Sequence, residues 1–243
     1  SVATEIKVVK CEVEGRQIIL VDTPSFEEPS PYDIDVLRMI ADWLKQTYQE
    51  GIELCGILYF HQITSNLWSP QLIDVFTKIC GPEAFKNVIF VTTMWNNESQ
   101  KKSREEELPI WSVMISSGAR TFRFFNSTSS AWNIVSQVDD TTRLPILLQT
   151  EMVTLGKGLP DTAAGKYLFG WLRDLLDYSR KRVEDLRMEL GGIKRSDSER
   201  TQLIKQIVVM EEQEKALQDM LRSYKPYQAV AGHGQDTLIL GDQ

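Results

Sequence analysis

The chain has 243 residues, 42% of them apolar and 25% charged, which is the composition of an ordinary globular protein and excludes a collagen, a disordered tail and a disulfide-stapled miniprotein. Its 34 acidic and 27 basic residues give a net charge of −7, which disfavours broad binding to nucleic acid or to anionic membranes. The three cysteines are far apart, the apolar runs are too short to span a bilayer, and no signal peptide is visible, so we expect a cytoplasmic protein.

Alternating strands and helices are expected over residues 1–140. Residues 5–13 and 17–22 have the β-branched, apolar patterns of two strands joined by a tight turn, and residues 32–48 have helical spacing. Further patterns indicate buried strands at 56–60, 88–92 and 121–125, with helices around 71–80 and 103–116. Strands separated by helices predict an α/β fold, with a mostly parallel sheet that includes strand 17–22 and has helices on both faces.

A helical extension is expected over residues 141–224, followed by a tail at 225–243. Two apolar stripes with steps of three and four residues, separated by Gly191-Gly192, predict an antiparallel helical hairpin. The expected stripes are Leu168, Leu172, Leu175, Ser179, Arg182, Leu186 and Leu190 on the first helix, and Leu203, Ile207, Met210, Glu214, Leu217 and Leu221 on the second. The two helices either pack only on each other or form a coiled coil between chains.

The clearest chemical signal is Asp22, at the end of the expected strand 17–22 and followed by Thr23-Pro24-Ser25-Phe26. A carboxylate at the carboxyl end of a parallel strand lies where ligands bind in open α/β sheets. In nucleotide hydrolases such an aspartate orients Mg²⁺, and the next turn presents a backbone N–H to the terminal phosphate. The same residue types also begin turns or cap helices, so this motif alone leaves both interpretations open.

Four segments together resemble the P-loop GTPases. Residues 22–26 resemble the D-T-P-G-F segment of that family, and the strand ending at residues 61–63 resembles its His-x-Ile strand. Residues 92–96 are similar to its T-x-M-W-D segment, and residues 129–131 to its guanine loop. More narrowly, the chain resembles the G-domain proteins of fungal genomes related to septins and to the immunity-associated GTPases, over residues 1–140 and the charged helical extension.

The resemblance implies roles for the residues that match these motifs. The complete family member binds GTP and Mg²⁺ and hydrolyses GTP; there, Asp22 would orient the metal and the Ser25 amide would meet the γ-phosphate, while Asn96 and Ala131 would border the base. The predicted nucleotide-binding residues are Asp22, Thr23, Ser25, Thr93, Asn96, Ser130 and Ala131, and the predicted metal ligands are Asp22 and Thr4.

Departures from the family pattern argue against activity. The 243 residues contain no G-x-x-x-x-G-K-[ST] loop, whose N–H groups and lysine cradle phosphates. Ser25 replaces a glycine, Asn96 replaces an aspartate that would accept two hydrogen bonds from guanine, and Ala3 rather than Thr4 falls at the preferred switch position. Family members carry the phosphate loop before the region where this chain begins, so the chain is either a piece of a longer domain or a form that has lost the loop.

We therefore expect a truncated or degenerate G domain with no catalytic residue of its own, in which guanine nucleotide binds weakly or not at all. The alternative function is a non-catalytic module that binds a protein partner, or a second copy, through residues 161–224. In the GTPase arrangement the absent strand lies between strands 17–22 and 56–60, so these two are expected to pair directly or to recruit residues 237–240. His61 could serve as a general base, but no nucleophile accompanies it and a structural role is favoured.

Overall fold

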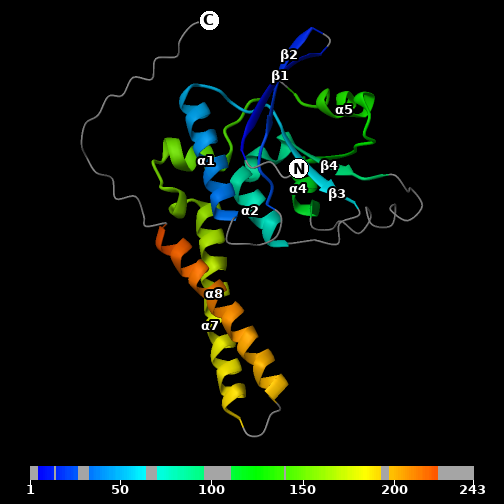
Figure 1. Ribbon diagram of the computed structural model, residues 1–243. Helices are drawn as coiled ribbons and strands as arrows, with labels where there is room; N and C mark the ends of the chain where they lie inside the picture. Colours follow the sequence, from blue (N-terminus) through cyan, green and yellow to red (C-terminus); the bar gives the residue numbers. More distant parts are fainter. Residues whose placement is uncertain are drawn as a thin grey trace, which may run out of the picture.

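A long helical pair projects from an α/β body in the computed structural model (Figure 1). The structure describes residues 5–13, 15–26, 33–63, 70–95, 111–139, 141–192 and 197–223. The predicted α/β class with a C-terminal helical hairpin is confirmed.

The strands of the described residues form two separate sheets. β1 (Lys7–Val13) pairs antiparallel with β2 (Arg16–Asp22), while β3 (Ile57–Gln62), β4 (Val88–Thr93) and β5 (Arg120–Arg123) form a parallel sheet in the order β3-β4-β5.

The prediction that strand 17–22 belongs to the parallel sheet was wrong, and of the two alternatives expected for its edge, direct pairing with strand 56–60 does not occur among the described residues. The connection between β1 and β2 is a tight turn in which Gly15 has a φ of +76°, and so short a connection permits only antiparallel pairing. The alternative partner, residues 237–240, lies outside the described residues.

β4 is the central strand of the parallel sheet, and its side chains divide the interior into two apolar clusters. Val88 and Phe90 belong to the main cluster, and Ile89 and Val91 belong to a smaller one with Ile134; all five are buried. The main cluster includes α1 (Asp33–Gln49) and α2 (Pro70–Cys80), and the smaller one includes α5 (Thr128–Val135). Because alternate residues of a strand point to opposite faces, helices cover both faces of this sheet, as expected.

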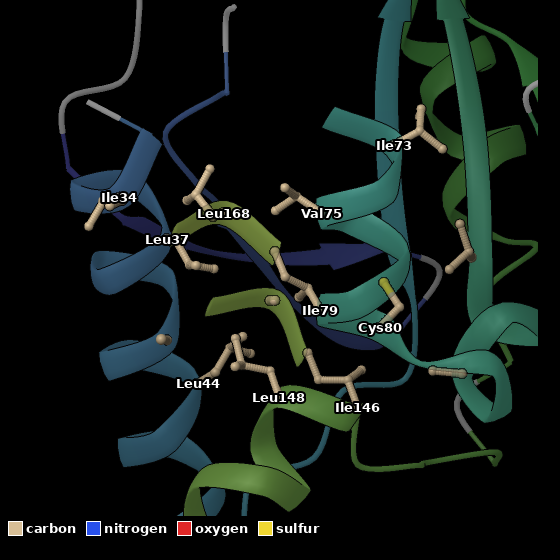
Figure 2. Close-up of a cluster of buried hydrophobic side chains, with 14 of the residues drawn as sticks. Ile34, Leu37, Leu44, Ile73, Val75, Ile79, Cys80, Ile146, Leu148 and Leu168 are labelled. Atoms are coloured by element: carbon tan, nitrogen blue, oxygen red, sulfur yellow. The ribbon is translucent and has the colours of Figure 1, made fainter. Parts of the chain in front are cut away.

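Figure 2 shows the main cluster, in which Leu168 and Leu148 lie between α1, with Leu37 and Leu44, and α2, with Val75 and Ile79. A 3₁₀ turn, η1 (Pro82–Asn87), leads from α2 into β4, and a short helix, α4 (Ser112–Ser116), precedes β5. Of the predicted helix at 103–116, the structure describes only the last part.

Residues after 140 continue into the same core. α6 (Leu147–Gln149) runs into a π-helical turn, η4 (Thr150–Thr154), and a 3₁₀ turn, η5 (Leu159–Asp161), precedes α7 (Ala163–Gly191). Ile146 and Leu148, before and within α6, and Leu168 in α7 pack into the main cluster (Figure 2). The division of the chain at residue 140 stays a prediction.

α7 and α8 (Asp197–Ser223) form the predicted hairpin (Figure 1). On α8 the buried residues Leu203, Ile207 and Leu217 lie on the predicted stripe. On α7 the prediction slips by one residue in the middle: Arg182 is exposed, whereas Val183 is buried. Leu176 is likewise more deeply buried than Leu175, because the helix advances by four residues, not three, after Leu172.

Two ion pairs join the helices of the hairpin, Arg187 to Glu211 at 2.6 Å and Arg180 to Glu214 at 3.2 Å. No helix in the described part of the chain is long and apolar enough to cross a membrane.

Candidate functional site

Two of the sequence motifs lie at the carboxyl edge of the parallel sheet, one after β4 and one at the start of α5. Beyond the strand ends, the amide of Ile63 donates to the carbonyl oxygen of Thr93 at 3.1 Å, and the amide of Phe124 donates to that of Thr92 at 2.8 Å. The Thr93 hydroxyl also donates to the His61 carbonyl oxygen at 3.4 Å. These bonds extend the ladder past β3, β4 and β5, so the edge is held by backbone contacts.

A tight turn follows β4, and Trp95 fixes it. The Trp95 indole N–H donates to the Thr92 carbonyl oxygen at 3.0 Å and lies 3.2 Å from the Thr92 hydroxyl. Between them Met94 has a φ of 66°, a left-handed conformation that residues with a side chain seldom adopt. Trp95 is buried while Met94 is exposed, so burial of the indole offsets the backbone strain at Met94. Asn96, the next residue and a predicted base contact, lies outside the described residues.

Arg123 covers this turn from the end of β5. Its guanidinium lies 4.4 Å from the centre of the Trp95 ring, a cation–π contact that the sequence analysis did not predict. No sequence signal marks the contact, because it follows from the parallel register, which places Arg123 opposite Thr92 and therefore beside the T-x-M-W segment.

The predicted guanine loop forms the capped start of α5. Ser127 is the N-cap residue: its hydroxyl accepts from the Ser130 amide at 3.2 Å, and the Ser130 hydroxyl donates to the Ser127 carbonyl oxygen at 2.9 Å. The amide of Ala131 donates to that same carbonyl oxygen at 3.0 Å. Both predicted contact residues, Ser130 and Ala131, thus use these groups to begin the helix.

The other predicted residues, Asp22, Thr23 and Ser25, lie at the end of β2 and just after it. Asp22, Thr23 and Ser25 are exposed, and Asp22 lies opposite Lys7 in the antiparallel register. Within the described ranges no three His, Cys, Asp or Glu side chains gather in a way that could hold a metal ion, and Thr4 lies outside those ranges. Mg²⁺ in nucleotide sites is held by one or two carboxylates together with substrate phosphates. Asp22 by itself does not fit that need.

His61 lies partly buried near the end of β3, and the structural role favoured from the sequence stays a prediction. Its ring packs edge-on to Trp111, with centroids 5.8 Å apart and planes at 84°. Burial lowers the pKa of His61 below its usual 6.5, so the imidazole is neutral near pH 7.

The predicted residues therefore fall into two groups. Thr93 ends β4 and Ser130 and Ala131 lie in the first turn of α5. Asp22, by contrast, ends β2 of the separate two-stranded sheet, and Thr23 and Ser25 follow it. At the other end of β2 from Asp22, a cavity of about 300 Å³ lies between the β1–β2 strand pair and α5. Its lining residues are Arg16, Ile18, Ser129, Trp132, Asn133, Val135 and Ser136.

Comparison with known proteins finds only distant similarity to solved structures. No family model matches the chain, and no curated protein matches it. Among solved structures, the chain is similar to two crystal structures of Toc33 from Arabidopsis thaliana, one of a dimerisation-deficient mutant and one of a complex with Mg²⁺ and GMPPNP. Both have 17% sequence identity and a TM-score of 0.41 over 51% of this chain, and the match spans 57% and 58% of the Toc33 chains. Likeness at this level carries no argument about function, and the narrower resemblance to septin-related proteins stays a prediction.

Proposed function

We propose that residues 1–140 derive from a guanine-nucleotide-binding domain, and that the 243 residues by themselves bind GTP weakly and do not hydrolyse it. The observation that carries the proposal is the order of motifs along the fold: the D-T-P segment follows β2, the T-x-M-W segment follows β4, and the Ser-Ser-Ala segment begins α5. In an open α/β sheet, ligands bind outside the carboxyl ends of the strands, where the β4 and β5 motifs lie.

Three features support weak binding. The sequence contains no phosphate loop with its lysine, so the triphosphate would keep most of its charge unneutralised. Asp22 belongs to no group of three His, Cys, Asp or Glu side chains among the described residues, and the Ala131 amide is already bonded to the N-cap residue of α5. Positioning and charge stabilisation supply almost all catalysis of phosphoryl transfer, and this chain supplies little of either.

The test is a titration of the purified 243-residue chain with a fluorescent GTP analogue in the presence of Mg²⁺. We expect no saturable binding in the micromolar range and no release of phosphate. Asp22→Ala should leave the weak signal unchanged, as should the matched control Asp139→Ala at a distant exposed aspartate. Micromolar binding that Asp22→Ala abolishes and Asp139→Ala preserves would overturn the weak-binding part of the proposal.

The origin of the domain has a separate test. If the gene encodes a G-x-x-x-x-G-K-[ST] loop and a helix directly before Ser1, a chain lengthened to include them should gain Mg²⁺-dependent GTP binding. A lengthened chain that contains the loop and binds no guanine nucleotide would refute a guanine-nucleotide domain.

A second candidate function is an interaction module built on α7 and α8. The observation that favours it is that α8 exposes Ile204, Val208 and Val209 to solvent at 48%, 46% and 52%, on a hairpin that projects from the α/β body (Figure 1). Sedimentation of the full chain and capture of partners by it are the direct measurements. A chain that stays monomeric and captures nothing would count against this function.

A further inference from the structure

α8 carries two stripes with heptad-like spacing, and only the inner one buries apolar residues against α7; of the outer one, Glu211 forms an ion pair with Arg187 of α7. The inner stripe contains the buried residues Leu203, Ile207 and Leu217. A second stripe also steps by four and three residues along the helix; its members are Asp197, Thr201, Ile204, Val208, Glu211 and Lys215. At about 100° per residue, this outer stripe lies roughly a third of a turn away from the inner one.

The outer stripe is accessible along the hairpin. Asp197, Thr201 and Lys215 are exposed, Ile204 and Val208 are about half exposed, and Glu211 is partly exposed beside Arg187. The hairpin stands clear of the α/β body over most of its length (Figure 1). A groove of about 590 Å³ runs on the side of the inter-helix ion pairs, and Met188 in its lining is exposed.

The outer stripe is self-complementary when read in opposite directions. Asp197 and Lys215 stand nine residues on either side of Gln206, and Ile204 and Val208 stand two residues on either side of it. An antiparallel second copy centred at Gln206 would place each aspartate against a lysine and each isoleucine against a valine. A parallel copy would instead place like charges together, which is destabilising.

We infer that α8 is a self-association surface, on which a second copy of the chain packs its own α8 antiparallel along the outer stripe. Two Ile204–Val208 contacts form the dry centre, and two Asp197–Lys215 pairs at the ends fix direction and register. Such two-fold pairing uses the same patch on both copies, as closed dimers do. The paired stripe is about 27 Å long, so the association is weak and depends on concentration.

This inference deepens the second candidate function, since it rests on the hairpin being an interaction module. The charge pattern commits it to one occupant, a second copy. If the chain captured another protein while staying monomeric, the module would stand and this inference would fail.

The first experiment is sedimentation equilibrium of the full chain over a range of concentrations. We expect the mass to rise from 27.8 kDa towards twice that value, and Val208→Glu to return it to the monomer. Val209→Glu is the matched control, because Val209 has nearly the same exposure but lies about 100° further round the helix, off the outer stripe. Equal effects of the two substitutions, or a wild-type monomer at all concentrations, would overturn the inference.

The second experiment tests direction by exchanging charges. Lys215→Asp alone and Asp197→Lys alone should each abolish the dimer, because each puts like charges together at both ends. An equimolar mixture of the two variants should recover it, since every contact then joins opposite charges. Lys181→Asp on the exposed side of α7 should change nothing, and failure of the mixture to recover the dimer would refute the antiparallel register.

Discussion

Gly165 lies in the first turn of α7, where the helix begins against the backbone of η5. The Gly165 amide donates to the hydroxyl of Thr162, the N-cap residue, at 3.0 Å. A methyl group on Gly165 would overlap the carbonyl oxygen of Leu159, and it would lie 2.8 Å from the Leu159 carbonyl carbon and 3.1 Å from the Pro160 Cα. All three atoms belong to the backbone, so no side chain can rotate away, and Gly165→Ala must move α7 or η5.

The cost follows from the packing. Overpacking a well-packed site costs about 1–3 kcal/mol, and we expect the upper part of that range because only the backbone can yield. In a protein of this length each kcal/mol moves Tm by about 2–4 °C, so Gly165→Ala should lower Tm by roughly 5–10 °C. Because α7 joins the main core cluster to the hairpin, the loss should appear in the unfolding of the whole chain.

Gly170 supplies a matched control five residues further along the same helix. A methyl group there meets no atom within 4 Å. Alanine in place of a mid-helix glycine stabilises a helix by about 0.5–1 kcal/mol, so Gly170→Ala should raise Tm by about 1–4 °C. Thermal unfolding of the three chains, followed by circular dichroism at 222 nm, measures both shifts. If Gly165→Ala were as stable as the wild type, or if both variants shifted in the same direction, the close contact with η5 would be refuted.

Three further predictions follow from burial and hydrogen bonding. Glu151 is buried, and its carboxylate accepts hydrogen bonds from Lys157 at 2.7 Å and from the first amide of α7 at 2.9 Å. Glu151→Gln should therefore lower the free energy of unfolding in urea by about 1–3 kcal/mol. An unchanged urea midpoint would contradict this role. Ile89→Thr, at a residue with no exposure, should cost about 2–4 kcal/mol, whereas Ile19→Thr, at 59% exposure, should cost less than about 0.5 kcal/mol. Hydrogen bonds from the hydroxyls of Thr141 and then Thr142 lower the pKa of Asp139 from 3.8 to about 2. The stability that these bonds contribute is therefore complete above pH 3.8 and is lost as the pH falls towards 2. A carboxyl titration by NMR in which Asp139 has a midpoint near 3.8 would refute these hydrogen bonds.

The strands of the parallel sheet could be predicted because a strand buried on both faces has a continuous run of apolar residues in the sequence. β4 has only apolar residues over its first four positions, and all four are buried on one face or the other. Burial of such a run is strongly favoured, since exposing it would cost about 25 cal/mol for each Å² of apolar surface. The prediction for β3 rested on the same kind of run, although Phe60 of that strand is 58% exposed.

The helical hairpin was predictable in kind but not in phase. Leucines fill both residue 175 and residue 176, so a step of three or four from Leu172 satisfies the apolar pattern equally well. Only the packing against α8 decides between them, and it buries Val183 where the sequence analysis had placed Arg182. α8 offers a similar choice, because Ile204 and Val208 directly follow Leu203 and Ile207 at the same spacing; there the predicted stripe is the one that the structure buries.

The candidate site was predictable as a set of motifs but not as a geometry. Nothing in the order of residues shows that Arg123 covers Trp95, since the two are joined only through the register of β4 and β5. The start of α5 at Ser127 carried a local signal that the sequence analysis did not use: a serine three residues before another hydroxyl residue can form a reciprocal cap. The guanine-loop interpretation and the cap concern the same residues, and the hydrogen bonds of Ser130 belong to the cap.

β2 is where sequence and structure differ most, and the difference has a physical cause. Its residues from Ile18 to Val21 have the continuous apolar composition of a strand buried on both faces, yet Ile19 and Leu20 are 59% and 37% exposed. The turn at Gly15 determines one neighbour of β2, namely β1, but no local signal determines its other edge, which pairs with no strand among the described residues. A two-stranded hairpin is at best marginally stable in water, so apolar side chains on both of its faces favour further cover. The composition of β2 is therefore better suited to a larger sheet than to this hairpin, as the proposed guanine-nucleotide domain requires, and the comparison of Ile19→Thr with Ile89→Thr measures how much of that cover exists in solution.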